Sequence, residues 1–244
     1  MNSKQELTGQ LALITGASRG IGAAIAERLA AAGAEVLLTG RSGRALEALV
    51  ERIRVAGGMA AYRVTDFGDP DAVAALIETV RAEYGRLDVL VNNAGIAESI
   101  ALTETSLEAW DRHMAVNVRA PFMLSTRLVD LLERSTNPVI VNIGSVVSYK
   151  GYPNQGAYTA SKHAVLGLSK VLAKELHSRN IRVHTVSPGG VSTDMIREVR
   201  PDIDPSDLMA PEEIAETILF LVLMRGNAVI DEVVLRRRKS EPWR

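Results

Sequence analysis

Short apolar runs alternate with amphipathic stretches along most of the 244-residue chain. Each apolar run is five to eight residues long, which suits a strand that is buried on both faces. We expect strands at residues 11–15, 35–39, 59–64, 87–91, 138–144, 181–187 and 228–235. The stretches between them have helical spacing, and we expect helices at 20–32, 42–56, 106–133, 157–179 and 211–224.

Local residues support several of these boundaries. Ser42 is a suitable N-cap, and Gly57-Gly58 ends the helix that it opens. Asp69-Pro70 is typical of a further helix start, because proline suits the first turn. Pro121 lies inside 106–133 and predicts a bend or a break there. Strands that alternate with helices predict a doubly wound, mostly parallel seven-stranded α/β sheet with helices on both faces, a Rossmann fold.

Composition narrows the class of protein. Apolar residues make up 47% and charged residues 23% of the chain, as in ordinary globular proteins. The net charge of −1 favours neither nucleic acid nor a membrane surface, and we read the basic run 236–239 as a solvated tail. The chain has no cysteine, and its four histidines lack metal-ligand spacing, so we expect no metal. We expect a single domain over 1–244, in the cytoplasm, because no linker, repeat or signal peptide is evident.

A glycine-rich turn, Thr15-Gly-Ala-Ser-Arg-Gly-Ile-Gly22, joins the first predicted strand to the first helix. Glycine at 16 permits a tight turn, glycine at 20 lets a pyrophosphate approach the backbone, and glycine at 22 lets the helix pack against the sheet. The helix end supplies free N–H groups and a positive dipole to that anion. A plain tight turn is the alternative. We predict a dinucleotide-binding turn made by Gly16, Ser18, Arg19, Gly20, Ile21 and Gly22.

The residues after the second predicted strand indicate the type of nicotinamide cofactor. An NAD site usually has a carboxylate there, on the ribose 2′-hydroxyl, but this strand ends in Gly40-Arg41. Arg41 and Arg19 could bind a 2′-phosphate in a fork. The alternative is that both arginines are solvated surface residues. We predict NADP(H) rather than NAD(H).

A candidate acid–base pair lies in the predicted helix 157–179. Tyr158 and Lys162 are four residues apart, so they share one helix face about 6 Å apart along its axis. A nearby ammonium stabilises tyrosinate, so we expect the pKa of Tyr158 to be lowered. Ser145 follows the strand 138–144 at the edge where parallel sheets bind ligands, and its hydroxyl could polarise a substrate carbonyl. Ser148 is the rival serine.

Taken together, these segments resemble the short-chain dehydrogenases/reductases over nearly the whole chain. The resemblance rests on Gly16-x-x-x-Gly20-x-Gly22, Asn92-Asn93-Ala94-Gly95, Asn117, Ser145, Tyr158-x-x-x-Lys162 and Pro188-Gly189, which occur in order. It implies that Asn117 binds a water that links Lys162 to solvent. It also implies a substrate lid near 190–210, a segment 92–95 that braces the sheet, and cofactor contacts from Asp66, Phe67, Asn92, Ala94, Gly95, Tyr158, Lys162, Val191 and Thr193.

The predicted function is NADP(H)-dependent interconversion of a carbonyl and a secondary alcohol, with Tyr158 as acid and base. A 3-oxoacyl-thioester reductase and a general ketone reductase both remain open. Many family members end in a diglycine turn that this chain lacks, which weakens the case for the usual tetramer and for a fatty-acid role. We expect a homo-oligomer, dimer or tetramer, acting on a small molecule. The alternatives are a non-catalytic NADP(H)-sensing protein and a nucleic-acid partner that binds through the basic tail.

Overall fold

The computed structural model describes residues 6–242, in which seven strands form one sheet. Every neighbouring pair of strands is parallel, and the order is β3-β2-β1-β4-β5-β6-β7. The strands are β1 Leu11–Thr15, β2 Glu35–Gly40, β3 Met59–Val64, β4 Val89–Asn92, β5 Val139–Ile143, β6 Arg182–Pro188 and β7 Glu232–Leu235. The predicted doubly wound parallel sheet is therefore confirmed.

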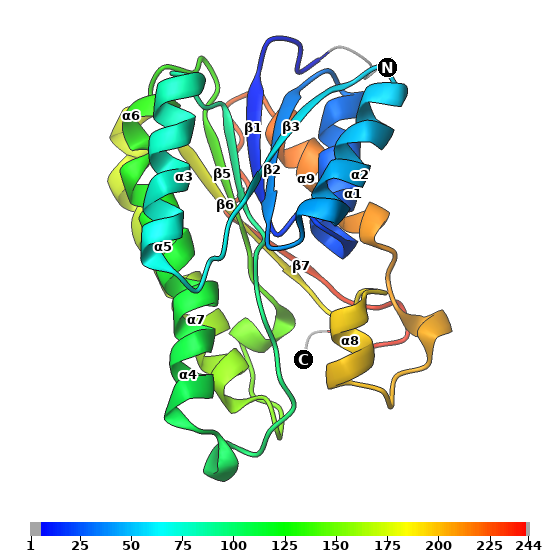
Figure 1. Ribbon diagram of the computed structural model, residues 1–244. Helices are drawn as coiled ribbons and strands as arrows, with labels where there is room; N and C mark the ends of the chain where they lie inside the picture. Colours follow the sequence, from blue (N-terminus) through cyan, green and yellow to red (C-terminus); the bar gives the residue numbers. More distant parts are fainter. Residues whose placement is uncertain (1–5, 243–244) are drawn as a thin grey trace.

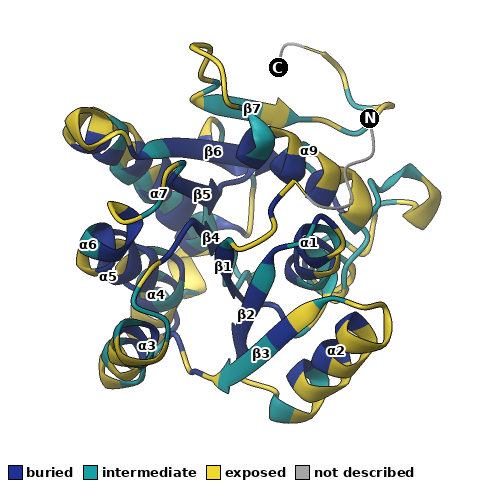
Figure 2. Cartoon of the chain, turned by 90° about the horizontal axis from the view of Figure 1, so that it is seen from above, coloured by how far each residue is buried: buried dark blue, intermediate teal, exposed yellow. Residues whose placement is uncertain are grey.

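Helices cover both faces of this sheet (Figures 1 and 2). On one face lie α1 Gly20–Ala31, α2 Gly43–Val55 and α9 Pro211–Leu223. On the other lie α3 Pro70–Glu83, α4 Leu107–Met114, α5 Ala120–Arg127, α6 Val129–Leu132 and α7 Gly156–Leu176. A short helix, α8 Asp194–Val199, lies at the end of the sheet where the strands finish. In the part of the chain described, no helix has the length and apolar character needed to cross a membrane.

The apolar runs become strands because both of their faces are buried. In β1, Ala12 and Ile14 pack with the α1, α2 and α9 side, whereas Leu11 and Leu13 pack with the α3 and α5 side. Side chains alternate between the faces of a strand, so a run that is apolar throughout has no face to give to solvent. This is why the boundaries of the inner strands follow the apolar runs to within a residue or two.

Two predicted helix starts are confirmed by their caps. The Ser42 hydroxyl accepts a hydrogen bond from Ala45 N at 3.3 Å, and the Asp69 carboxylate accepts one from Asp71 N at 2.9 Å. The last strand is shorter than predicted and covers only Glu232–Leu235. The segment 228–231 is not a strand, because parallel pairing with β6 starts at the partner residues Thr185 and Glu232.

The predicted helix 106–133 is divided, and the division starts before the proline. A π-helical turn, η2 Ala115–Arg119, separates α4 from α5, and Asn117 lies at its centre. Pro121 has no N–H to donate to the carbonyl of Asn117, four residues earlier, so regular α-helical bonding cannot continue there. The proline therefore acts on the residue at which the family resemblance predicts a functional side chain.

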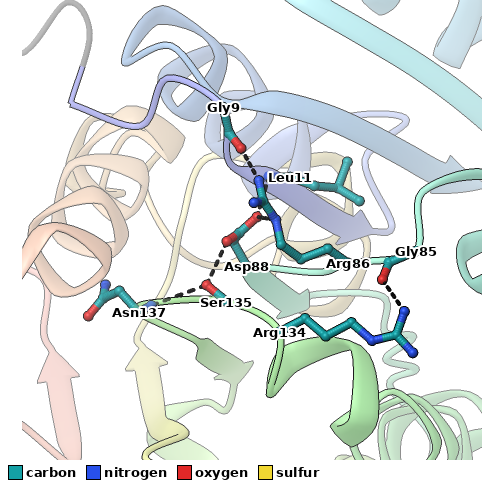
Figure 3. A network of polar contacts seen from close by, with 8 residues as sticks. All are labelled: Gly9, Leu11, Gly85, Arg86, Asp88, Arg134, Ser135 and Asn137. Carbon is teal, nitrogen blue, oxygen red and sulfur yellow. Dashed lines mark hydrogen bonds and ion pairs between the residues drawn. The ribbon is translucent and has the colours of Figure 1, made fainter.

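A buried carboxylate ties together the edge of the sheet where the strands begin (Figure 3). Asp88 is 2% exposed, and its oxygens accept hydrogen bonds from Leu11 N at 2.8 Å, Arg86 Nε at 3.1 Å and Ser135 Oγ at 2.5 Å. The Arg86 guanidinium also donates to the carbonyl of Gly9. These bonds join the starts of β1 and β4 to the turn that precedes β5 and leave the opposite edge free for a ligand site.

Candidate active site

A cavity of about 1100 Å³ opens at the carboxyl edge of the sheet. The turn after β1, the segments that follow β4 and β5, and the segment that follows β6 all contribute to its wall. In an open α/β sheet, ligands bind at this edge because neighbouring strand ends diverge there. The cavity brings together most of the site residues that were predicted from separate parts of the sequence.

The glycine-rich turn forms one end of the cavity. Gly16 has a φ of +65°, and a Cβ on Gly22 would lie 2.4 Å from the carbonyl oxygen of Gly16. Glycine at 22 therefore lets α1 begin directly against the turn itself, whereas the sequence suggested that it serves packing on the sheet. The first turn of α1, Gly20-Ile21-Gly22, is uncharged and lines the cavity, so its free N–H groups point to an anion site.

The neighbouring wall carries Arg41, predicted to bind the 2′-phosphate, together with Asp66 and Phe67, which the resemblance gives as cofactor contacts. Arg41 and Asp66 are exposed there, and Phe67 is buried. Position 40, at the end of β2, is where an NAD site would have its carboxylate. A Cβ added to Gly40 would lie 2.4 Å from Ser18 Oγ, so a longer side chain fits there only if Ser18 moves. Arg19 is not an isolated surface residue, because its guanidinium forms a 2.9 Å ion pair with Asp194 at the start of α8.

Asn92 lies outside the cavity wall, and its side chain takes the second implied role, that of bracing the sheet. Its amide donates to Ser125 Oγ at 2.9 Å and to Asn142 Oδ1 at 2.8 Å, which braces β4 against β5 and α5. Asn93 faces the cavity in its place and donates to the carbonyls of Thr15 and Gly16. Successive side chains along a strand point to opposite faces of the sheet, so Asn92 and Asn93 reach different surroundings. Ala94 and Gly95 line the cavity as predicted.

The two candidate serines take different positions. Ser145 is the residue that lines the cavity, and its side chain hydrogen-bonds Tyr158. Ser148 lies behind it, where its hydroxyl donates to the main-chain carbonyl of Lys162 at 3.0 Å and accepts from Ser145 N at 3.3 Å. Ser148 therefore holds the turn η3 Val146–Ser148 on α7, and Ser145 is the serine that a substrate can reach.

Tyr158 and Lys162 lie together on α7 and face the cavity, with the Lys162 ammonium 5.8 Å from the centre of the Tyr158 ring. Burial raises the pKa of Tyr158, and the hydrogen bond with Ser145 opposes that rise only in part. The expected lowering of this pKa is therefore not seen. Burial also lowers the pKa of Lys162 to about 8, and its ammonium donates to the carbonyl of Ile143 at 2.7 Å instead of to the tyrosine.

Asn117 lies behind Gly95 and does not touch Lys162 directly. Its amide donates to Ile96 O and Ser161 Oγ, both at 2.9 Å, and its oxygen accepts from Ile96 N at 2.8 Å. A Cβ on Gly95 would lie 3.4 Å from the Asn117 oxygen and 3.7 Å from the Lys162 ammonium. Asn117 thus fixes the segment after β4 against α7, close to Lys162.

The remaining wall comes from the segment after β6 and, unexpectedly, from the C-terminal segment. Val191 and Thr193 line the cavity after β6, followed by residues of α8. Arg236, Arg237 and Ser240 also line it, so the basic run is part of the site and not the solvated tail that the sequence suggested. Tyr149, Tyr152 and Gln155 are further lining residues that sequence reasoning missed. No local pattern marks them, because only the fold brings them to the cavity.

Within residues 6–242, no group of three or more acidic, histidine or cysteine side chains could hold a metal ion.

The fold and this cavity define a dinucleotide-binding protein with a tyrosine, a lysine and a serine at the end of its ligand site. The family model described as short chain dehydrogenase matches residues 10–204. The 3-oxoacyl-[acyl-carrier-protein] reductase FabG of Escherichia coli (strain K12) is 38% identical over 221 residues, which cover 87% of this chain and 89% of that protein.

Solved structures agree with this match. A metagenomic short-chain oxidoreductase in complex with NADP superimposes with a TM-score of 0.84 and 36% identity, over 96% of this chain and 99% of that one. A short chain dehydrogenase from Burkholderia cenocepacia J2315, in complex with NADP, gives a TM-score of 0.86 and 34% identity over 96% and 98%. The chain belongs to the short-chain dehydrogenase/reductase family, whose members are oxidoreductases.

Proposed function

We propose that this protein uses NADPH to reduce a ketone to a secondary alcohol. The observation that carries the proposal is the hydrogen bond between Ser145 and Tyr158 at the cavity wall. Lys162 and the glycine-rich phosphate turn line the same cavity. Two hydroxyl donors that converge on one point suit a carbonyl oxygen, which gains negative charge as it is reduced. The non-catalytic sensor is the alternative, and it would have no need of this arrangement.

The residues present fit NADP(H). The uncharged start of α1 offers N–H groups to the pyrophosphate, and Arg41 and Arg19, which line the same cavity, are proposed to bind the 2′-phosphate. Two relatives of known structure, at 36% and 34% identity, bind NADP. We expect kcat/KM with NADPH to exceed that with NADH by at least about tenfold, since a charged hydrogen bond contributes about 1.5–3 kcal/mol. Equal use of NADH would contradict the assignment of both arginines.

When bound, NADPH supplies the hydride that reduces the carbonyl carbon. Ser145 and Tyr158 donate hydrogen bonds to the carbonyl oxygen and orient it. Tyr158 then gives its proton to that oxygen, and its raised pKa means that the phenol holds this proton at neutral pH until the oxygen gains negative charge. Lys162 lies near the ring as a cation that stabilises the tyrosinate left behind.

Proton resupply is assigned to Lys162 and Asn117. The Lys162 ammonium, with a pKa of about 8, can release and regain a proton near neutral pH. Asn117 holds the segment after β4 in place beside that ammonium, and we propose that a water bound there links it to solvent. Val191 and Thr193 are positioned to hold the carboxamide of the nicotinamide, and Asp66 and Phe67 to flank the adenine.

A 3-oxoacyl thioester is the first substrate class to test, because the E. coli relative is a 3-oxoacyl-[acyl-carrier-protein] reductase. A general ketone is the second, since Met195 and Ile196 line the cavity, and segments over a ligand site carry substrate choice among proteins that share one fold. A panel that begins with acetoacetyl thioesters, followed through the absorbance of NADPH, separates the two classes.

Replacing Tyr158 by phenylalanine distinguishes the enzyme from the sensor. The variant keeps the ring and loses the proton donor, so we expect kcat to fall at least about 1000-fold, within the range found for acid–base groups. NADPH binding, measured by nucleotide fluorescence, should stay within about twofold of wild type. Near-normal turnover in a folded Tyr158→Phe protein would refute the role of this residue.

We also propose that the protein is a single-domain cytoplasmic homo-oligomer with a lid at 190–210. Large apolar side chains are exposed on the helices that cover one face of the sheet, namely Leu107 on α4, Phe122 on α5 and Val171 on α7. Exposed apolar groups on adjacent helices are typical of an interface between subunits. Light scattering on the purified protein gives the number of subunits, and a monomer would contradict the proposal.

A further inference from the structure

The segment that follows β7 forms part of the cavity wall and has a backbone held by its own hydrogen bonds. The Arg236 guanidinium donates to the carbonyls of Arg237 at 3.3 Å, Arg238 at 3.1 Å and Ser240 at 2.7 Å. Ser240 N also donates to the Arg237 carbonyl at 2.9 Å, which closes a turn. One basic side chain is thus used to fix the backbone of the next four residues, so the run 236–239 has a defined shape.

Two contacts hold this turn at the catalytic end. Gly189 N donates to the carbonyl of Leu235 at 2.7 Å, which fastens the end of β7 to the segment after β6. Lys239 forms an ion pair with Asp207 in the short helix η5 Pro205–Asp207 of the lid. In Figure 1 the red end of the chain passes beside α8, and both line the same cavity. The turn is therefore tied to both sides of the substrate opening.

Arg237 is directed inward by its surroundings. A Cβ on Gly190 would lie 3.3 Å from Cδ of Arg237 and 2.9 Å from Cδ2 of Leu208, so glycine at 190 makes room for the arginine stem. Gly190 precedes Val191, where the nicotinamide end of the cofactor is proposed to lie. Arg237 is half-buried and lines the cavity, whereas its neighbours Arg236 and Arg238 are exposed. No carboxylate among residues 6–242 forms an ion pair with it.

A second arginine approaches from the lid. Arg200 lines the cavity, stacks on Tyr152 with its guanidinium 5.8 Å from the ring centre, and donates twice to Asp202 at 2.7 Å. The hydrogen bond with Arg200 lowers the pKa of Asp202, and the charge of Arg237 adds a smaller contribution, so Arg237 lies near this pair. The charged residues that line this end of the cavity are the cations Lys150, Arg200, Arg236 and Arg237 and the carboxylate Glu241, and Asp202 pairs with Arg200 beside the wall.

We propose that Arg237, with Arg200 beside it, is an anion subsite that binds a carboxylate or phosphate group of the ketone substrate. A guanidinium binds either oxyanion through two parallel N–H groups, and its charge is kept at every working pH. The inference rests on the proposed ketone reduction and narrows it to anionic substrates. It gives the basic run a task within the active site, in place of a contact with nucleic acid or solvent.

The test compares matched charged and neutral ketones in wild type and Arg237→Gln. Acetoacetate and its methyl ester form one pair, and acetoacetyl-CoA and acetoacetyl-N-acetylcysteamine form the other. We expect kcat/KM for the charged member to fall about 10- to 100-fold, in line with the loss of a charged hydrogen bond, and that for the neutral member to change less than about threefold. A loss confined to acetoacetate identifies a carboxylate site, and a loss confined to the CoA ester identifies a phosphate site.

Two further variants serve as controls for the Arg237→Gln result. Arg238→Gln removes an exposed charge from the same turn and should leave all four substrates unchanged. Arg237→Lys should retain part of the preference for the charged ketone, since it keeps the charge and loses the fork. Equal losses for charged and neutral substrates, or no loss for either, would overturn the proposal.

A binding measurement separates the subsite from the proposed function. Calorimetric titration of acetoacetate and of CoA into the protein saturated with NADP⁺ needs no turnover. We expect Arg237→Gln to weaken the binding of at least one of these anions by about tenfold or more. If wild type reduces none of the four ketones, the proposed function fails, and an unchanged affinity in the variant would then reject the subsite as well.

Discussion

Lys162 carries a buried charge, and Lys162→Met tests what that burial costs the folded protein. The side chain is 5% exposed, and burial lowers its pKa from 10.5 to about 8. One pKa unit corresponds to about 1.4 kcal/mol, so the charge destabilises the folded state by about 3 kcal/mol at pH 7. Methionine has a similar length, but it leaves the Ile143 carbonyl without its donor, which offsets about 1 kcal/mol. We expect a net gain of about 2 kcal/mol in the free energy of unfolding, together with loss of turnover.

The gain should depend on pH with a definite sign. Between about pH 8 and 10.5 the lysine keeps its proton in the unfolded chain and has released it in the folded protein. The unfolded state then binds more protons, so wild-type stability rises with pH across this window and the advantage of methionine shrinks.

Urea unfolding of the ligand-free protein, at one protein concentration and at pH 7 and about pH 9.5, measures both effects. Lys170→Met, on an exposed position of the same helix, is the control and should change stability by less than about 0.5 kcal/mol at either pH. The reasoning fails if Lys162→Met is less stable than the control at pH 7, or if its advantage is the same at both pH values.

Two other predictions concern the sheet edge and the cofactor end. Asp88→Ala should lower the free energy of unfolding by about 3 kcal/mol, because buried donors including Leu11 N lose their acceptor. Its kcat and KM should stay near wild type, since the cavity lies at the opposite edge; a stability change under about 1 kcal/mol would contradict this account of the network. Asp194→Asn should release Arg19 for the 2′-phosphate and lower KM for NADPH by up to about fivefold, the limit for an exposed ion pair. Glu216→Gln breaks the ion pair with Arg28 on the outer surface as a control, and a raised KM in Asp194→Asn would show that the pair supports the site instead.

Much of the candidate site could be predicted because its residues lie next to elements that the sequence defines well. Gly16 and Gly22 flank a turn between a buried strand and a helix, and Ser145 lies two residues after the end of β5. Tyr158 and Lys162 are four residues apart on one helix, so they share a face in any fold that keeps the helix. The choice between Ser145 and Ser148 came from the resemblance, and the structure gives its physical reason in the turn that hides Ser148.

The direction in which a side chain points and the extent of its burial could not be read from the sequence. For the segment 92–95 the resemblance implied both cofactor contacts and a brace for the sheet, and the structure separates the two: the Asn92 side chain braces β4 against β5, whereas Asn93 faces the cavity. The pKa of Tyr158 was expected to fall, yet burial raises it, and the ammonium of Lys162 donates to the carbonyl of Ile143 and not to the tyrosine. The extent of burial follows from packing, and no spacing along the chain encodes it.

The sequence by itself determined the parallel sheet, the phosphate turn and the tyrosine–lysine pair. These features follow from local periodicity, since runs that are apolar on both faces must be covered by helices and since helical spacing fixes neighbours. Only the tertiary structure decided that the C-terminal basic run lines the cavity and that Arg237 lies over Gly190. Residues 190 and 237 meet because β7 pairs with β6 in parallel, so the ends of both strands reach the same edge. Contacts of this kind depend on sheet topology, and they decide which molecule Tyr158 can meet.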